Sequence, residues 1–406
     1  MTTDQYILRT THVPNMAERE AITYYFSKGY DYQTILLFLE REHDIKISKR
    51  TLLNRLKEYG LRRRGRDEDE DIIKEYIKRE LDGSGSLLGY RAMWRKLHSK
   101  YGINVARYTV QALLKELDPE GTVLRKNKRL TRRKYTNPGP NYCWHSDGYD
   151  KLKPYGFPIH GCIDGFSRRI LWLKVTKSNN DPRIIGSFFL EKIKEVEGCP
   201  SLVRTDRGTE NGIMATIQCF LRRNDSDSLA GLNAHRYGSS HSNQRIEGWW
   251  SFLRRSWSTW WINFFKDVIE KGELDTSNLL QMKCLWFCFH QVIQNEINQM
   301  KDDWNNHQIR PSKYQTLAGI PDKLYFLSET VGAVDHKHPF DLSDVQEAEN
   351  EIYSYDADAD ADSDSTSESD DYYTYFEYVL EHFGINPPTD WKESLEAYLR
   401  IIHVAS

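Results

Sequence analysis

Residues 144–147 read Trp-His-Ser-Asp, residues 204–211 read Arg-Thr-Asp-Arg-Gly-Thr-Glu-Asn, and residues 242–247 read Ser-Asn-Gln-Arg-Ile-Glu. Each stretch contributes one acid: Asp147, Asp206 and Glu247. The first two acids are separated by 58 residues and the last two by 40. Acids this far apart cannot share one local loop, so strands and a helix must bring them together. We therefore expect a compact domain with a metal site at its centre.

The segments around these acids predict a mixed α/β domain. Apolar and β-branched residues predict strands at 143–147, 157–163, 169–175, 202–206 and 234–237, and helices at 181–196, 212–223 and 244–257. Asp164-Gly165, between the second and third strands, is a hairpin signal. The order of elements is therefore β-β-β-α-β-α-β-α.

Taken singly, each acid has an ordinary explanation. Asp147 suits a strand-end hairpin and Glu247 suits a helix surface. Taken together, and placed on two strands and a helix, the three acids favour a site for two Mg²⁺ or Mn²⁺ ions that supports phosphoryl transfer. Gly208 lets the backbone turn beside this site, and Asn211 could orient a phosphate or a metal-bound water.

The N-terminal part of the chain is basic and helical. Residues 1–140 carry a net charge of +10, whereas residues 341–406 carry −16, so a polyanion is the expected partner of the first part. Helices are predicted at 17–26, 32–40 and 49–59, the second capped by Asp31 and the third by Ser48. This pattern is typical of a helix-turn-helix, whose last helix enters the major groove. The expected DNA contacts here are Lys49, Arg50, Arg55, Arg62, Arg63 and Arg64.

A second helical unit covers residues 71–117 and is followed by a basic run. Residues 125–134 hold seven cations in ten residues, among them Arg132, Arg133 and Lys134. Such a run has an ordinary explanation, a solvated linker or an import signal, and a functional one, a DNA clamp, and both explanations can hold at once. Near the acids, Asn243 and Arg245 are also expected to contact DNA.

The C-terminal part divides by composition. A long helix is predicted at 279–306, and residues 311–343 should be irregular. Residues 344–371 are rich in Asp and Ser and are expected to be disordered. The aromatic tail at 372–406 fits one or two helices. No segment predicts a signal peptide or a membrane span, and six scattered Cys favour an intracellular protein.

The motifs around the acids resemble those of a known superfamily. Trp-x-x-Asp at Asp147, Thr-Asp-x-Gly-x-Glu-Asn at Asp206 and Asn-Gln-x-Ile-Glu at Glu247 are similar to the Asp-Asp-Glu core of retroviral integrases and transposases. The resemblance implies a ribonuclease H-like, five-stranded mixed sheet flanked by helices, with the three acids as catalytic metal ligands. The wider pattern is similar to integrase core proteins of eukaryotic transposable elements. That likeness implies a nuclear homo-oligomer acting on element ends and target DNA.

These observations lead to a set of hypotheses about domains and function. The expected domain boundaries are 1–66 (helix-turn-helix), 67–137 (second helical unit and basic linker), 138–310 (catalytic core), 311–343 (irregular extension), 344–371 (acidic disordered segment) and 372–406 (tail). The expected function is metal-dependent phosphodiester cleavage and strand transfer during DNA integration. The alternatives are a domesticated, catalytically silent DNA-binding protein and a hydrolase of RNA–DNA hybrids.

Overall fold

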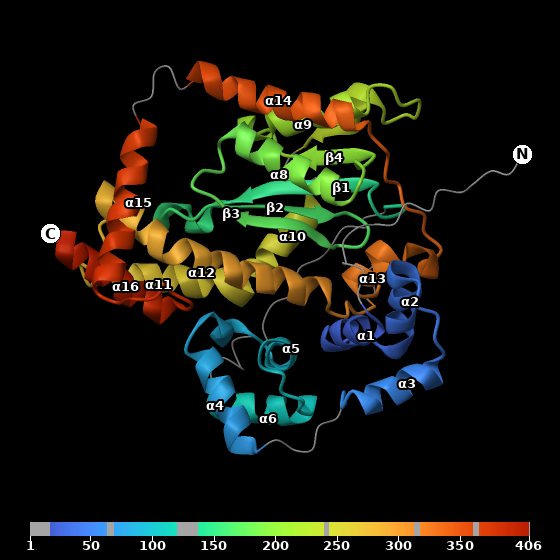
Figure 1. Ribbon diagram of the computed structural model, residues 1–406, viewed down its shortest axis with the longest axis horizontal. Coiled ribbons are helices and arrows are strands. Elements are labelled where there is room, and N and C mark those ends of the chain that lie inside the picture. Colours follow the sequence, from blue (N-terminus) through green and yellow to red (C-terminus); the bar gives the residue numbers. More distant parts are fainter. Residues whose placement is uncertain are drawn as a thin grey trace, which may run out of the picture.

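The computed structural model describes residues 17–62, 69–119, 137–238, 243–311, 317–359 and 365–405 (Figure 1). A five-stranded sheet forms its centre, with the strands in the order β3-β2-β1-β4-β5. The strands are β1 (Cys143–Tyr149), β2 (Ile159–Asp164), β3 (Ile170–Val175), β4 (Leu202–Thr205) and β5 (His235–Tyr237). β1, β2 and β3 pair antiparallel, whereas β1–β4 and β4–β5 pair parallel. The expected mixed sheet of five strands is therefore confirmed.

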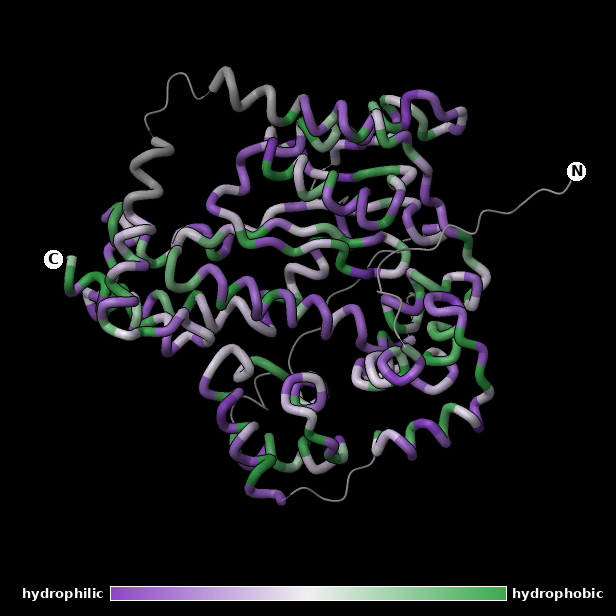
Figure 2. The backbone as a smooth tube through the Cα atoms, viewed as in Figure 1, coloured by the Kyte–Doolittle hydropathy of each residue, from purple (hydrophilic) through white to green (hydrophobic). Residues whose placement is uncertain are grey.

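Helices cover both faces of the sheet, which makes the core two hydrophobic layers. One face packs on α8 (Pro182–Glu195) and α9 (Gly212–Leu221), and the other on α10 (Gln244–Leu253) and α12 (Leu279–Asn305). Hydrophobic stretches follow the strands that lie between these layers (Figure 2). The expected ribonuclease H-like arrangement, a mixed sheet flanked by helices, is present.

The turn between β2 and β3 has a local cause in the sequence. The buried Asp164 carboxylate accepts hydrogen bonds from the backbone of Phe166 and Ser167, at 3.1 and 2.7 Å, and from the Ser167 hydroxyl. Arg168 then adopts a φ of 63°, which lets the chain reverse into β3. The Asp-Gly signal thus marks a true reversal, because the short acidic side chain hydrogen-bonds the backbone that follows it.

The first helical unit consists of α1 (Glu18–Ser27), α2 (Tyr32–His43) and α3 (Lys49–Glu58). The predicted caps are present: Asp31 accepts from the Thr34 N–H at 3.0 Å, and Ser48 accepts from the Thr51 N–H at 3.1 Å. These three helices share a small apolar core, which also includes Ile320 and Leu327 from the chain after α12.

The second helical unit has its own core and docks on the long helix α12. It comprises α4 (Glu70–Leu81), the 3₁₀ turn η1 (Ser84–Leu87), α5 (Tyr90–Tyr101) and α6 (Arg107–Leu117). The Ser84 hydroxyl donates to Glu296 Oε2 at 3.1 Å. The same oxygen accepts from the indoles of Trp257 and Trp261 at 2.6 and 2.9 Å. One carboxylate oxygen therefore joins this unit to the helices that pack on the sheet.

The helix after the polar loop runs further than the sequence pattern predicts. The prediction ended it at Trp257, but α10 passes through a π-helical turn, η6 (Arg254–Ser258), into α11 (Thr259–Glu270). The π turn inserts an extra residue and keeps Trp257 and Trp261 buried, at 1% and 0% exposed. Aromatic packing against α12 thus continues the helix where no local stop signal exists.

The chain after α12 is more ordered than expected. Residues 311–343 were predicted to be irregular, but they include α13 (Pro321–Phe326) and the 3₁₀ turn η7 (Ser328–Val331). The disorder predicted for residues 344–371 is corrected for the described part, which belongs to α14 (Leu342–Ala359) and α15 (Ser365–His382), whereas residues 360–364 lie outside the described residues. Helix α16 (Trp391–Ala405) follows.

Helix α14 is amphipathic, although the composition of its segment is acidic. Val345, Ala348 and Ile352 recur at helical spacing and pack into the core beneath α8 and α9. On the polar side of α14, Asp344 forms a bidentate ion pair with Arg223, and both hydrogen bonds measure 2.9 Å. Among the residues whose side chains the structure describes, Val345, Ala348 and Ile352 are the apolar positions that hold α14 on the apolar surface of α8 and α9.

In the part of the chain that the structure describes, no helix is both long and apolar enough to cross a bilayer.

Candidate active site

Asp147 lies on β1, at the centre of the sheet. Its cross-strand partner on β2 is Gly161. The Trp250 indole N–H donates to Asp147 Oδ2 at 2.9 Å, so one carboxylate oxygen is fixed from helix α10. The carboxylate is half-buried.

Asp206 follows the last residue of β4, which runs parallel to β1. The carboxyl ends of neighbouring parallel strands meet at one edge of a sheet, and this brings Asp206 toward Asp147. Asp206 Oδ1 accepts from the Gly208 N–H at 3.1 Å and from Asn211 Nδ2 at 3.0 Å. These two donors set the orientation of the carboxylate.

The backbone of Gly208 does not adopt a left-handed conformation. Its φ is −66°, which any residue can adopt. A Cβ at this position would lie 2.0 Å from the Glu210 carboxylate. The glycine leaves room for the Glu210 carboxylate, which would have to shift if a Cβ were present, and the conformational reason expected from the sequence does not apply.

Glu247 lies in the first turn of α10, and Asn243 anchors the start of that helix. Asn243 Nδ2 donates to the Ser146 carbonyl at 2.9 Å, and Asn243 Oδ1 lies 2.7 Å from His145 Nδ1. His145 is fully buried, and burial lowers its pKa to about 3, so it is neutral at physiological pH. The result is a fixed distance between α10 and the residues just before Asp147.

The electrostatics show that the three acids share one neighbourhood. Burial raises the pKa of Asp147 to about 7; the hydrogen bond from Trp250 opposes this rise, and the negative charges of Glu247 and Asp206 add to it. A carboxylate with so high a pKa in the protein alone is one that a cation would stabilise strongly. All donors are hard carboxylate oxygens, which are the ligands that Mg²⁺ and Mn²⁺ prefer.

The ligand atoms of the three acids do not all lie within 4.8 Å of one another. Among the described residues, the group of three acid, His or Cys side chains whose ligand atoms lie within 4.8 Å of one another is Asp225, Asp227 and His338, and not the three acids above. A site for two ions about 4 Å apart spreads its ligands more widely. The wider spacing of Asp147, Asp206 and Glu247 is therefore compatible with a pair of metals.

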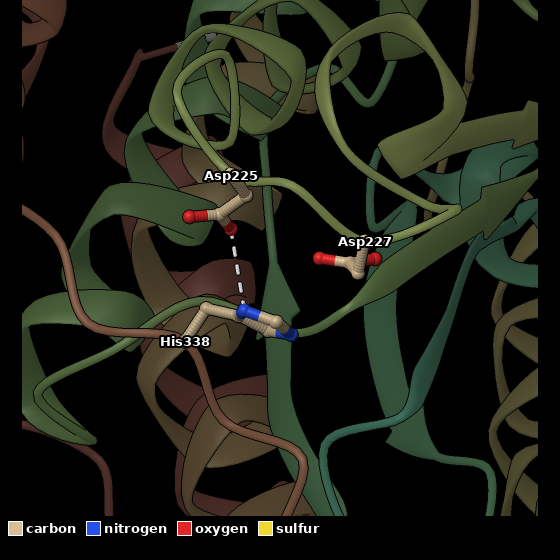
Figure 3. A group of neighbouring side chains, drawn as sticks. All are labelled: Asp225, Asp227 and His338. Carbon is tan, nitrogen blue, oxygen red and sulfur yellow. Dashed lines mark ion pairs between the residues drawn. The ribbon is translucent and has the colours of Figure 1, made fainter.

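The Asp225–Asp227–His338 group is an ion-pair network (Figure 3). The buried Arg222 guanidinium donates to Asp225 Oδ2 at 2.5 Å and also to Asp227. His338 Nδ1 lies 3.2 Å from Asp225, and its Nε2 lies 2.9 Å from the Ser201 hydroxyl. Because the Arg222 guanidinium already bonds both aspartates, we interpret the group as a clamp between the loop after α9 and the chain that enters α14.

The predicted DNA contacts differ in their surroundings. Lys49 and Arg50 are exposed on α3, and Arg62 is exposed just after it. Arg55 instead forms ion pairs with Glu18 and Glu58. Arg245 Nε donates to the Gly165 carbonyl at 2.8 Å.

Asn211 and Asn243 are each 1% exposed, and their side-chain amides bond within the site. The remaining predicted contacts lie outside the described residues: Arg63, Arg64, Arg132, Arg133 and Lys134.

Sequence reasoning did not identify the link between Trp250 and Asp147. It treated the tryptophans of this helix as core, and Trp250 is indeed 5% exposed. The available signal was the spacing of Asn243, Glu247 and Trp250, which places all three on one face of a helix. An indole in that row can still donate a hydrogen bond while its ring is buried.

Two family models match this chain. Residues 134–331 match the integrase core domain, and residues 66–127 match the HTH-like domain. These segments contain the three acids and the helices α4 to α6, respectively.

Curated relatives come from mycobacteria. A transposase for insertion sequence element IS986/IS6110 of Mycobacterium tuberculosis (strain H37Ra) is 29% identical over 197 residues, which cover 43% of this chain and 68% of the relative. The corresponding transposase of Mycobacterium bovis (strain AF2122/97) gives the same values. That of Mycobacterium tuberculosis (strain CDC 1551) is 30% identical over 120 residues, which cover 26% of this chain and 43% of the relative.

An integrase core behind an HTH-like domain, on the mixed sheet described above, is the organisation of a superfamily of nucleases and polynucleotidyl transferases. The chain belongs to this integrase and transposase superfamily.

Proposed function

We propose that this protein is a DNA transposase or integrase that cleaves phosphodiester bonds and transfers DNA strands with divalent metal ions. The observation that supports the proposal most is that Asp206, just after β4, and Glu247, on α10, lie near enough to Asp147 on β1 for their charges to act on it. The negative charges of Asp206 and Glu247 both raise the pKa of Asp147, so the three carboxylates act on one another. The curated relatives, which are named as transposases, support the same function.

In this proposal the three carboxylates are the metal ligands. Two Mg²⁺ or Mn²⁺ ions would act as Lewis acids toward the attacking and leaving oxygens of the phosphodiester. Asp147 would be shared between the ions, Asp206 would hold one of them, and Glu247 would complete the set. Gly208 and Asn211 keep the Asp206 carboxylate in one orientation before any ligand binds. Pre-orientation of this kind lowers the cost of assembling the site.

Duplex DNA is the proposed partner, bound mainly by the N-terminal units. Lys49 and Arg50 on α3 present exposed cations where a recognition helix would meet a major groove. Arg62 and the cationic side chains of residues 63–64 and 132–134 would add phosphate contacts. In this proposal, domains 1–66 and 67–137 bind DNA and domain 138–310 holds the metal ions. Strand transfer between two element ends favours a homo-oligomer.

The compartment is part of the proposal as well. The resemblance to eukaryotic transposable elements and the basic run at 125–134 favour the nucleus. The curated relatives are bacterial, and they support the DNA substrate without bearing on the compartment.

The decisive experiment compares the wild type with Asp206→Asn. The substrates are supercoiled plasmid and duplexes that carry the repeats flanking the coding region, with Mg²⁺ or Mn²⁺. We expect the variant to lose more than about a hundredfold of the cleavage rate, beyond the 10–100-fold typical of residues behind the ligands. DNA affinity in EDTA should stay unchanged. Asp267→Asn, which removes an exposed acid on α11, is the matched control and should cleave normally.

If wild type and Asp206→Asn bind DNA equally and are equally inert with both metals, the proposal fails. The domesticated, silent DNA-binding protein then becomes the better account. Cleavage restricted to RNA–DNA hybrids would favour the hydrolase instead.

A further inference from the structure

Trp250 is a side chain that hydrogen-bonds the carboxylate of Asp147. Its indole N–H donates to Asp147 Oδ2 at 2.9 Å. Trp250 belongs to α10, the same helix that carries Glu247. One helix therefore contributes both an acid of the site and a hydrogen bond to another acid.

The ring of Trp250 is closely packed by its neighbours. Gly161 is the cross-strand partner of Asp147, and a Cβ on Gly161 would lie 2.8 Å from the far edge of the Trp250 ring. The Tyr149 ring packs against it at a centroid distance of 5.1 Å, and the Trp249 ring lies edge-on at 5.2 Å. The indole N–H is thus aimed by the packing of its ring.

A second contact on the same face of α10 also attaches this helix to β1. Asn243, Glu247 and Trp250 recur at i, i+4 and i+7, so they share one face of the helix. Asn243 bonds the Ser146 carbonyl and Trp250 bonds the Asp147 carboxylate. Glu247 lies between two points at which α10 is attached to β1.

The neighbouring tryptophan shows that packing alone does not require such a bond. Trp249 is 1% exposed on the same helix, and its indole nitrogen has no hydrogen-bond partner among the described residues. A buried tryptophan in this core is therefore tolerated with its N–H unbonded. The bond from Trp250 to Asp147 is a separate feature of the site.

We propose that Trp250 is a positioning residue, which holds the Asp147 carboxylate at the orientation and distance from Glu247 that a divalent metal requires. This inference rests on the proposed function. Trp250 touches no substrate in it and acts only through Asp147. Losing the N–H should lower metal affinity, because the carboxylate then loses a charge-assisted hydrogen bond and turns more freely.

The test replaces Trp250 by Phe, which keeps an aromatic ring and removes the N–H. Trp249→Phe is the matched control, because it makes the same change at an indole without a partner. We expect Trp250→Phe to raise the Mg²⁺ concentration for half-maximal cleavage by about tenfold. The rate at saturating Mg²⁺ and the DNA affinity in EDTA should stay close to the wild-type values. Trp249→Phe should not move the Mg²⁺ requirement.

A second measurement does not depend on catalysis. Calorimetric titration of the protein with Mn²⁺ should show weaker binding for Trp250→Phe by a similar factor, and unchanged binding for Trp249→Phe. Gly161→Ala offers an independent variant that keeps the N–H and displaces the ring. It should weaken Mn²⁺ binding as well, and thermal melting identifies any variant that fails to fold.

Two outcomes are distinguishable. If the wild type binds Mn²⁺ and cleaves DNA but Trp250→Phe binds Mn²⁺ equally well, the positioning role is refuted and the proposed function stands. If the wild type neither binds Mn²⁺ nor cleaves DNA, the proposed function itself fails.

Discussion

Asp147 is a residue of the candidate site whose negative charge the folded, metal-free protein disfavours. Its carboxylate lies beside Trp250 and near the charges of two other acids, and burial, with those charges, raises its pKa to about 7. The ordinary pKa of an aspartate is near 4. The folded protein without metal therefore binds a proton more tightly than the unfolded chain does. The stability that this residue contributes is full at low pH and is lost as the pH rises through about 4 to 7.

We predict that Asp147→Asn stabilises the metal-free protein above pH 7. The substitution removes a charge that the fold disfavours, so the free energy of unfolding should rise, by up to about 4 kcal/mol for a shift of this size. The gain should shrink toward zero near pH 4. Thermal melting in EDTA across pH 4 to 8 measures it, with Asp267→Asn as the exposed control.

With bound metal, the wild type should become more stable than Asp147→Asn. Saturating Mg²⁺ should raise the melting temperature of the wild type more than that of Asp147→Asn, because ligand binding stabilises the folded state in proportion to affinity. A pH-independent difference between the two proteins would contradict this account of Asp147.

At the scale of elements, the long helix α12 closes the open edge of the sheet. β3 is an edge strand, and its free backbone groups would otherwise invite pairing with another chain. Gln294 accepts from the Val175 N–H at 2.8 Å and donates to the Leu173 carbonyl at 3.1 Å. Asn305 makes the same pair of bonds to the backbone of Ile170. Two side-chain amides thus stand in for a missing strand.

Gln294→Ala should therefore destabilise the core and expose the edge of β3. Leaving a buried donor and acceptor without partners costs about 1–3 kcal/mol. Chemical denaturation measures the loss, and light scattering measures any tendency to associate. Gln291→Ala is the control on the same helix, because Gln291 is exposed and bonds only Asn295 in the described structure. Equal stability of the two variants would show that α12 does not close the edge through Gln294.

At the scale of the whole molecule, the chain after α12 returns to cover the helices that pack on the sheet. α14 lies over α8 and α9, and α16 lies over α12 (Figure 1). Tyr398 and Ile401 of α16 are fully buried in the same core as Cys284 and Cys288. The C-terminal tail is therefore part of the hydrophobic core of this fold.

Ending the chain at Pro387, which removes α16, should unmask that core. We expect the two thiols of α12, which are buried in the full chain, to react with a thiol reagent without denaturant. The free energy of unfolding should fall by at least about 3 kcal/mol, since several large apolar contacts disappear. A chain that ends at His403 keeps Tyr398 and Ile401 and serves as the control. Thiols that stay unreactive in the shorter chain would contradict the packing role of α16.

Local chemistry made a large part of this fold predictable. Asp31 and Ser48 cap helices because a short oxygen side chain satisfies free N–H groups wherever it precedes a helix. The strands and their order followed from apolar patterning, and the candidate acids followed from motif and spacing. The choice of Asp147, Asp206 and Glu247 as metal ligands stays a prediction until the variants are measured.

The sequence by itself determined the helices of the two N-terminal units, the strands of the sheet and their order along the chain, because propensity, capping and periodicity act over a few residues. Only the tertiary structure decided that α14 is a packed helix, that α10 continues through a π turn, and that Trp250 bonds Asp147. Each of these depends on a surface supplied by residues far away in the chain. Burial against such a surface overrides acidic composition and missing local signals, because the free energy comes from the contact and not from the segment alone.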